Sequence, residues 1–335
     1  MVRRIARLKL VIGSLLVMLL AAVPLALAQD GGALPDMIVA EREGFFPEGI
    51  EYDEQGGRYL LSSLAEGTIF TVTDDGMITP FITEEELMSS VGIHIDRERS
   101  RLLVANTDRA VTEGGASNIM LMAYDLVSGN RLFAADLMAV APEGRHFAND
   151  VTVDAEGNAY VTDSFSPVIY RVDVDGNASV FAQDERFASA QFGLNGIDYH
   201  PNGYLIAAKA SDGALFKIPV DDPQNITQVE LDIPVTGADG IIFHPDGSLI
   251  VVGSPQTVFS VSSSDDWATA SVVEQVTLAQ PATTAAIRDG EVYALFAHLN
   301  QMGSETPPAA FEIVRVPLAQ NDGAGETADS EPAVG

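Results

Sequence analysis

Short apolar runs, separated by polar residues and glycine-containing turns, recur along most of the chain. They include residues 59–61, 102–104, 159–161, 204–206, 249–251 and 292–294. A helical period is hard to find in the same segments, and apolar runs bounded by Gly, Asp and Asn are typical of β-strands. The pattern therefore predicts an all-β protein.

A second motif precedes each of these strands and sets the architecture. Its first residue, here called the anchor position, is in most repeats followed by a small residue and then an aliphatic one. The anchor positions are Glu48, Val91, Asn149, Asn195, Asp239 and, more weakly, Thr284. The first five lie 43, 58, 46 and 44 residues apart, which is the spacing of propeller blades.

The repeat therefore predicts a six-bladed β-propeller with four-stranded antiparallel blades. Residues 37–40 precede the first blade, and we expect them to supply the outermost strand of the last blade and so close the ring. A β-sandwich or jelly roll is the main alternative, but it does not explain a sixfold recurrence of the same turn.

The N-terminal residues indicate export. Four basic residues precede an apolar run that ends in Ala26-Leu27-Ala28, a pattern typical of a secretory signal peptide. We expect residues 1–28 to be a signal peptide cleaved after Ala28, residues 29–318 to be the propeller, and the protein to be secreted or periplasmic. An uncleaved membrane anchor is the alternative.

The acidic composition restricts the kinds of partner that the protein can bind. The formal net charge is −30, and the signal peptide removes basic residues only, so the mature chain is more acidic still. We expect a monomer that binds a small molecule, with no nucleic acid partner and no stable membrane insertion after cleavage. The chain has no cysteine for disulfides or thiolate metal sites. The acidic tail 319–335 has no hydrophobic pattern, and we expect it to be disordered.

The anchor positions also carry candidate chemistry. The first strand of a propeller blade lines the central channel, so equivalent residues of successive blades converge there. Glu48, Asn149, Asn195 and Asp239 bring two carboxylates and two amides to this place. Such an oxygen set suits one divalent cation, Ca²⁺ first and Mg²⁺, Mn²⁺ or Zn²⁺ as alternatives. The alternative without a metal is a water-filled channel in which these side chains form hydrogen bonds to one another.

The second strand of each blade ends at the same rim and supplies further candidates. Asn106, Asp163 and Lys209 are predicted to bind substrate, and His298 to transfer a proton. His146, three residues before Asn149, is the other proton-transfer candidate. Insertions at residues 108–118 and 299–309 flank the first blade and suggest a lid over the Glu48 side of the channel. Rim polarity and tolerated insertions are the simpler readings.

Four segments resemble the senescence marker protein/gluconolactonase/luciferin-regenerating enzyme family over nearly all of residues 46–318. They are Phe46-Pro47-Glu48-Gly49-Ile50, Ala148-Asn149-Asp150-Val151, Gly193-Leu194-Asn195-Gly196-Ile197 and Ala238-Asp239-Gly240-Ile241. The resemblance implies a six-bladed propeller with a catalytic divalent metal on the four anchor residues, and hydrolysis of lactones or phosphoesters. The ligand set looks closer to the calcium-dependent phosphotriesterase-like branch. Ile242 stands where that branch has an acidic ligand of a second calcium, so one metal is expected.

The resulting hypothesis is an exported hydrolase of the lactonase or esterase type. Asp239 would act as nucleophile or leave attack to an activated water, and Asp150 would orient Asn149 or act as base. A lactone is favoured over a phosphoester because Lys209 is the single cation read at this rim. A non-catalytic binding propeller with a structural metal is the main alternative. A synthase-like propeller of the strictosidine synthase type fits the anchor residues less well.

Overall fold

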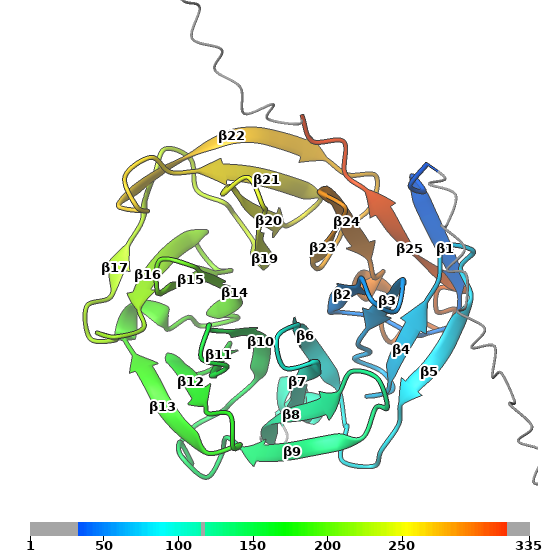
Figure 1. Cartoon of the computed structure of the whole chain (residues 1–335), viewed down its shortest axis with the longest axis horizontal. Helices are drawn as coiled ribbons and strands as arrows, with labels where there is room; N and C mark the ends of the chain where they lie inside the picture. Colours follow the sequence, from blue (N-terminus) through cyan, green and yellow to red (C-terminus); the bar gives the residue numbers. More distant parts are fainter. Residues whose placement is uncertain (1–32, 115–117, 320–335) are drawn as a thin grey trace, which may run out of the picture. The chain divides into compact units, whose positions relative to one another are not determined.

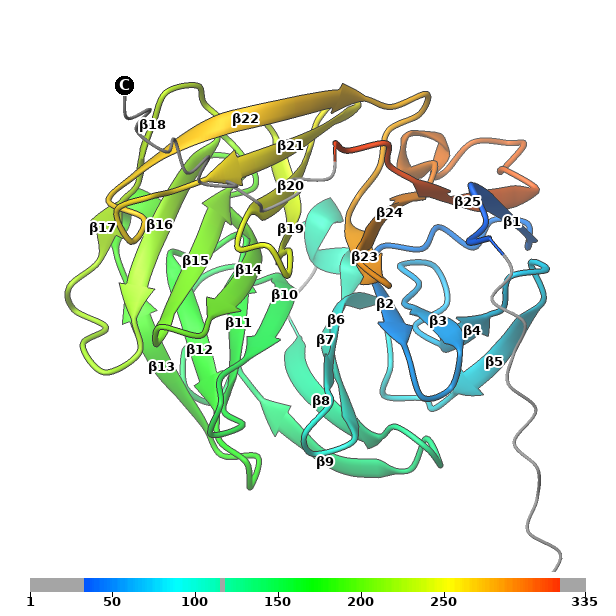
Figure 2. The ribbon, with the colours of Figure 1, turned by 45° about the horizontal axis from the view of Figure 1, so that its top comes forward.

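The fold consists of six antiparallel sheets that surround a common axis as the blades of a propeller (Figures 1 and 2). The computed structural model describes residues 33–114 and 118–319. Its regular elements are strands and three short 3₁₀ turns, and no α-helix occurs in these ranges. The prediction of an all-β, six-bladed propeller is confirmed.

Each blade runs outward from the axis in chain order. Blade one holds β2 (Ile50–Asp53), β3 (Arg58–Leu61), β4 (Ile69–Val72) and β5 (Ile78–Ile82). Blade two holds β6 (Ser90–Asp96), β7 (Arg101–Thr107), β8 (Ile119–Asp125) and β9 (Arg131–Asp136). Blade three holds β10 (Ala148–Val153), β11 (Ala159–Asp163), β12 (Val168–Val172) and β13 (Ala178–Gln183).

The remaining blades repeat this order. Blade four holds β14 (Leu194–His200), β15 (Tyr204–Lys209), β16 (Ala214–Pro219) and β17 (Thr227–Gln228). Blade five holds β19 (Ala238–Phe243), β20 (Leu249–Gly253), β21 (Thr257–Ser262) and β22 (Thr269–Thr277), with the short β18 (Glu230–Leu231) parallel to β22. Blade six holds β23 (Ala285–Arg288), β24 (Glu291–Phe296) and β25 (Ala310–Arg315). The 3₁₀ turns are η1 (Arg109–Glu113), η2 (Glu185–Phe187) and η3 (Leu299–Gln301).

The ring closes through the beginning of the described chain. β1 (Met37–Glu41) pairs antiparallel with β25 as the outermost strand of blade six (Figure 1). The Tyr293 hydroxyl donates to the Pro35 carbonyl at 2.9 Å and fixes the entry to β1. The expectation that residues 37–40 complete the last blade is confirmed. This pairing joins the first and last strands of the described chain, so blade six has its fourth strand and the ring is closed.

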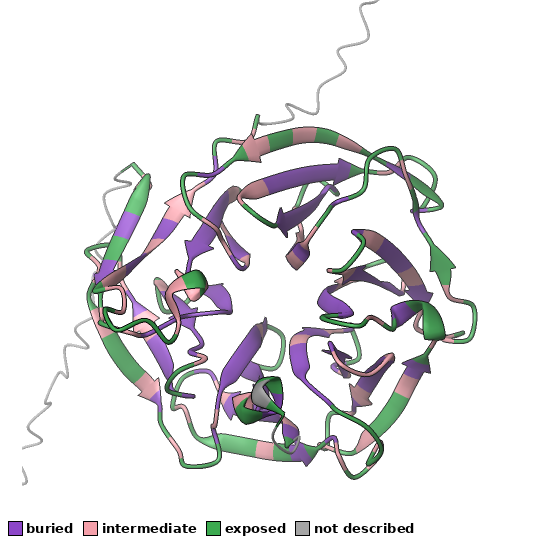
Figure 3. Ribbon diagram, turned by 180° about the vertical axis from the view of Figure 1, so that it is seen from behind, coloured by how far each residue is buried: buried purple, intermediate pink, exposed green. Residues whose placement is uncertain are grey.

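The core lies between adjacent blades. Inner strands are almost wholly buried, whereas outermost strands alternate or face water (Figure 3). One cluster joins Tyr59 of blade one to Tyr293 and Phe311 of blade six, with the Tyr59 and Tyr293 rings 5.7 Å apart. Each blade buries both of its faces against its two neighbours, so the complete ring fixes where the inner-strand residues lie.

A β-bulge marks the anchor position in four blades. The register of the first strand against the second shifts between Ser90 and Ile93, Ala148 and Val151, Leu194 and Ile197, and Ala238 and Ile241. The small residue after the anchor has a steric reason. A Cβ on Gly196 would lie 2.4 Å from the Asp239 carbonyl oxygen, and one on Gly92 would lie 2.7 Å from that of Asn149. The inner strands thus approach one another too closely for a side chain.

The predicted ends of the chain lie outside the described residues. The signal peptide, residues 1–28, and all of the acidic tail except Ala319 belong to the ranges that are not described. Within residues 33–114 and 118–319, no helix is long and apolar enough to cross a membrane.

Candidate metal centre and the two ends of the channel

The six anchor regions surround one small cavity, as their register predicts. The cavity has a volume of about 20 Å³ and is lined from every blade, by residues that include Glu48, Gly92, Asn149, Asn195, Gly240 and Thr284. A volume of this order holds about one water molecule or ion. Bulges are a common means of redirecting a side chain next to a functional site, and here they lie at Asn149, Asn195 and Asp239.

Asn149 has a buried oxygen without a partner. Its side-chain amide donates from Nδ2 to Ser164 Oγ at 2.8 Å, and its Oδ1 is buried with no hydrogen bond. Leaving a buried acceptor unsatisfied costs roughly 1–3 kcal/mol. An acceptor oxygen left free beside a cavity the size of an ion is what a cation ligand requires.

The carboxylates of the site are buried and repel one another. Burial, followed by the charges of Asp239 and Asp150, raises the pKa of Glu48 well above its ordinary value. Burial also raises the pKa of Asp239 to about 7. A hydrogen bond from Asn195 lowers this pKa, and the charge of Asp150 raises it further. Asp239 does not itself line the cavity, but it bonds to Asn195, which does. The arrangement favours a positive charge between these groups.

Asp150 joins two blades below the anchor positions. Its carboxylate accepts from the Val151 N–H at 2.9 Å and from the Ile197 N–H of blade four at 3.1 Å. Burial raises the pKa of Asp150 to about 7, although these N–H groups and the charge of His94 lower it. Asp150 lines the cavity beside Asn149, so the structure brings these two predicted site residues together.

Histidine does not contribute to this centre. Among the described residues, no group of three or more His, Asp or Glu side chains is placed to hold a metal ion. The four-residue set of anchor positions has two carboxylates and two amides and depends on the amide oxygens. It therefore suits a cation that accepts neutral oxygen ligands, such as Ca²⁺, better than one that prefers nitrogen.

Hydroxyl groups at the ends of the second strands stitch the inner strands together, a role that the sequence did not indicate. Ser62 Oγ donates to the Val91 carbonyl at 2.5 Å, and Thr162 Oγ1 donates to the Asn195 carbonyl at 2.6 Å. Thr107 Oγ1 donates to the Ala148 carbonyl at 2.9 Å, and Ser164 Oγ to the Leu194 carbonyl at 2.7 Å. These bonds hold the backbone at, or one residue before, the anchors Val91, Asn149 and Asn195 to the preceding blade.

Two of the predicted substrate-binding residues are buried in other contacts. Asn106 is fully buried, accepting from the Met88 N–H at 2.9 Å and donating to the Glu86 carbonyl at 2.7 Å. Asp163 is also fully buried and accepts from three N–H groups, among them those of Phe147 and Phe165, each at 3.0 Å. Through these hydrogen bonds the two side chains hold neighbouring loops in place, and neither side chain lines the cavity.

His146, predicted to transfer protons, lies in the same buried network. Its Nδ1 is 2.7 Å from Asp163 Oδ2 and 3.0 Å from the Tyr170 hydroxyl, and its Nε2 is 2.9 Å from the Glu143 carbonyl. Burial alone lowers the pKa of His146, but the bond and the charge of Asp163 raise it above its ordinary value. With both ring nitrogens engaged, His146 is placed to organise the rim rather than to meet a substrate.

Lys209 and His298 each lie beside a carboxylate at the rim. Lys209 Nζ is 3.0 Å from Asp212 Oδ2, and His298 Nε2 is 2.7 Å from Glu312 Oε2. His298 has a left-handed backbone, with φ of 54°, and neither residue lines the cavity. The two predicted insertions do meet, because Arg109 Nη1 of η1 lies 2.8 Å from Met302 Sδ just after η3.

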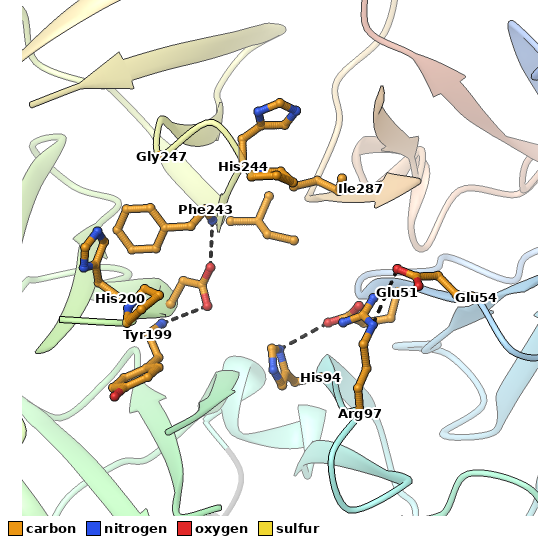
Figure 4. Close-up of a pocket in the computed structure, with 14 residues that line it drawn as sticks. Glu51, Glu54, His94, Arg97, Tyr199, His200, Phe243, His244, Gly247 and Ile287 are labelled. Atoms are coloured by element: carbon orange, nitrogen blue, oxygen red, sulfur yellow. Dashed lines mark hydrogen bonds and ion pairs between the residues drawn. The ribbon is translucent and has the colours of Figure 1, made fainter. Parts of the chain in front are cut away.

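The opposite end of the channel is much wider. A pocket of about 480 Å³ lies where the inner strands end, and Glu51, His94, Asp198, Tyr199, Ile242 and Phe243 are among the residues that line it (Figure 4). Its charged groups are paired: His94 Nδ1 lies 3.2 Å from Glu51 Oε1, and Arg97 Nε lies 3.7 Å from Glu54 Oε1. Burial lowers the pKa of His94, but Glu51, Asp198 and Asp150 raise it above its ordinary value.

Comparisons with known proteins support the fold. No protein-family model and no curated protein sequence matches the chain. The allergen Mala s 1 of Malassezia sympodialis is similar in structure, with a TM-score of 0.72 and 20% identity over 85% of this chain and 96% of that one. A gluconolactonase from Xanthomonas campestris (TM-score 0.58, 15% identity, 84% and 89% covered) and a luciferin-regenerating enzyme (TM-score 0.58, 14% identity, 84% and 98% covered) are also similar.

The last two proteins belong to the group that the sequence motifs resemble, so the structural likeness agrees with that expectation. At 14–20% identity the likeness shows a shared propeller fold. A fold of this kind carries several reactions, and the reaction has to be argued from the site.

Proposed function

We propose that the chain is an exported, metal-dependent hydrolase that acts on a lactone or related ester at the anchor end of the channel. One divalent cation, Ca²⁺ before Mg²⁺, Mn²⁺ or Zn²⁺, is held by Glu48, Asn149, Asn195 and Asp239. The observation that carries the proposal is the buried, unpartnered Oδ1 of Asn149 beside a cavity that all six blades line.

The charge of the site fits a divalent cation. Two carboxylates, Glu48 and Asp239, balance two positive charges, and the oxygens of Asn149 and Asn195 add neutral ligands. Without a cation, burial and then the charges of Asp239 and Asp150 raise the pKa of Glu48. Calcium takes six to eight oxygen ligands, so four protein ligands leave positions for water and substrate.

The chemistry divides between the cation and the protein. When bound, the cation would polarise the ester carbonyl and stabilise the negative charge that develops on its oxygen. Asp239, which bonds to the cavity residue Asn195, would attack the carbonyl carbon or take a proton from an attacking water. Asp150 accepts a hydrogen bond from the Ile197 N–H of blade four. It also lines the cavity, where it would accept a proton.

The lining of the anchor cavity favours an ester over a phosphoester. Lys209, the one cation that the sequence placed at the rim, is paired with Asp212. Phosphoryl groups are usually held by several Arg or Lys donors, and the anchor cavity is lined by none. Export to the periplasm or the outside remains part of the proposal, resting on the N-terminal pattern of basic and apolar residues.

Turnover with and without chelator tests the proposal. Purified protein is assayed against a panel of lactones and aryl esters, first with Ca²⁺ and then with excess EGTA. We expect hydrolysis of at least one member with Ca²⁺ and its loss with EGTA. Equal turnover under both conditions would exclude the metal-dependent reaction. Failure to cleave any substrate would favour a ligand-binding propeller with a structural metal.

A further inference from the structure

A groove on the anchor-side rim has the features of a binding subsite. It has a volume of about 380 Å³ and lies between blade three, the connection to blade four and the blade-two insertion. Arg145, Phe165, Phe192, Gln191, Ser189 and Thr112 line it. Grooves of this size accept small organic molecules.

Aromatic rings form one wall of the groove. Phe165 and Phe192 lie with ring centroids 5.2 Å apart, and both pack on the buried Phe147, at 5.6 and 5.7 Å. Phe192 nevertheless leaves 39% of its surface exposed. Three rings that pack together, one of them open to solvent, offer a planar surface for another ring.

The same wall connects directly to the proposed metal centre. Phe165 follows Ser164, which accepts the hydrogen bond from Asn149 Nδ2. Phe192 precedes Gly193, whose N–H donates to the Ser164 carbonyl at 2.8 Å. A Cβ at Gly193 would lie 2.5 Å from the Phe187 carbonyl oxygen, so the backbone there is tightly placed. The wall of the groove is therefore joined through the backbone to Ser164, which bonds Asn149.

Arg145 gives the groove a positive charge. Its guanidinium lies 4.6 Å from the Phe165 ring centroid, and Nη2 donates to the Val111 carbonyl at 2.6 Å. Arg42, Arg58, Arg131, Arg186 and Arg288 all pair with carboxylates. No carboxylate of a described side chain pairs with Arg145. In a chain of net charge −30, an arginine that no described carboxylate pairs with, beside an aromatic wall, points to an anionic ligand.

We propose that this groove binds the non-reacting part of the substrate: a planar aromatic group that lies against Phe165 and Phe192 and carries a carboxylate bound by Arg145. The proposal rests on the proposed function, because it names the class of ester or lactone that this site accepts. The aromatic body and its charge lie in the groove, and the scissile bond lies toward Asn149.

Binding of unreactive aromatic probes tests the groove without any reaction. Isothermal titration compares 2-naphthoate, the neutral 2-naphthamide and the cationic 2-naphthylmethylamine, with EGTA present throughout. We expect 2-naphthoate to bind tightest, although the net charge of the protein favours the amine. Arg145→Met should weaken 2-naphthoate roughly 10- to 100-fold, the range for hydrogen bonds to charged groups, and should remove its advantage over the amide.

Matched variants separate local from general effects. Arg186→Met removes the same charge from another arginine placed over a phenylalanine, 5.8 Å from the Phe216 centroid, and should leave naphthoate binding unchanged. Phe192→Ala should weaken all three probes about tenfold by removing the open ring. Leu132→Ala, at a comparably exposed apolar site, should have no effect.

The outcomes distinguish the groove from the hydrolase. Tighter binding of the amine than of 2-naphthoate, or wild-type affinity in both Arg145→Met and Phe192→Ala, would overturn the groove whether or not the protein hydrolyses esters. Preferred naphthoate binding that Arg145→Met abolishes would support the groove even if no ester were cleaved. Where turnover exists, 4-acetoxybenzoate should show a lower KM than phenyl acetate, and Arg145→Met should remove that difference.

Discussion

The two ends of the channel differ in a way that separates size from chemistry. The far end has a pocket of about 480 Å³, but its charged groups have partners, as His94 has Glu51 and Arg97 has Glu54. The anchor end has only about 20 Å³, yet it holds a buried acceptor without a donor and carboxylates that repel one another.

The difference teaches that the volume of a pocket is a weak guide to the place of the chemistry. A polar group that already has a hydrogen-bond partner is stabilised little by a ligand. A buried polar group without a partner is stabilised more, because the ligand removes the free-energy penalty of its burial. On this account the small cavity is the reactive site, and the wide pocket is the solvated mouth of the ring.

The largest expected effect comes from a matched pair of buried glutamates. Glu48→Gln should lower Ca²⁺-dependent turnover roughly 10²- to 10³-fold, because it removes one charge that holds the cation. Glu51→Gln makes the same change at the far end and should alter turnover less than threefold. Steady-state kcat/KM on the best substrate of the panel is the measurement. Equal losses in both variants would remove the distinction between the two ends.

Calcium should stabilise the wild-type protein and the far-end variant alike. At a concentration one hundred times Kd, a ligand bound only by the folded state adds about 2.7 kcal/mol. Thermal unfolding with Ca²⁺ and with EGTA should show this gain in wild type and Glu51→Gln. Glu48→Gln should lose it, and in EGTA this variant should be more stable than wild type because one of the repelling carboxylates is gone.

Stability in EGTA should fall as pH rises. Burial raises the pKa values of Asp150 and Asp239 to about 7, above an unfolded value of about 4. The folded state therefore binds more protons between these values. Its stability from these groups is full below about pH 4 and is lost as pH rises through about 7, by roughly 1–3 kcal/mol.

Denaturant unfolding at pH 5.5 and pH 8 measures this slope. His94, whose pKa is also raised, contributes in the same direction, so His94→Gln serves as the control and should keep most of the slope. Saturating Ca²⁺ should flatten it, since the cation replaces the protons. A slope that Ca²⁺ leaves unchanged would place the titrating groups elsewhere.

The smallest effect should come from filling the wide pocket. Ile242→Trp places a bulky side chain among the residues that line the far end and should change neither kcat nor KM by more than about twofold. A loss of turnover in a variant that unfolds at the wild-type temperature would give the far end a part in the reaction.

The sequence predicted what depends on the repeat. Sixfold recurrence gave the blades, the closure by residues 37–40 and the convergence of Glu48, Asn149 and Asn195, since equivalent positions in a ring must meet at its axis. The glycine that follows four of the six anchors was visible as a column, and its cause is the close approach of neighbouring strands.

Other features depend on contacts that no local pattern reveals. Asn106 and Asp163 end second strands and looked like channel residues, but they turn into the loops at Met88 and Phe147. His146 meets Asp163 and Tyr170, which lie 17 and 24 residues further along the chain. The aromatic groove beside Arg145 joins four separate loops, so its parts become neighbours only in the folded ring.

The central claim is that Asn149 presents a free oxygen to a cation, and direct calcium titration tests it most simply. Calorimetry of metal-free wild type should show one Ca²⁺ per chain, and Glu51→Gln should match it. Asn149→Leu keeps the approximate size of the side chain but removes the oxygen, and should bind Ca²⁺ at least tenfold more weakly or not at all. Full calcium affinity in Asn149→Leu, or no calcium bound by the wild-type protein, would contradict the account.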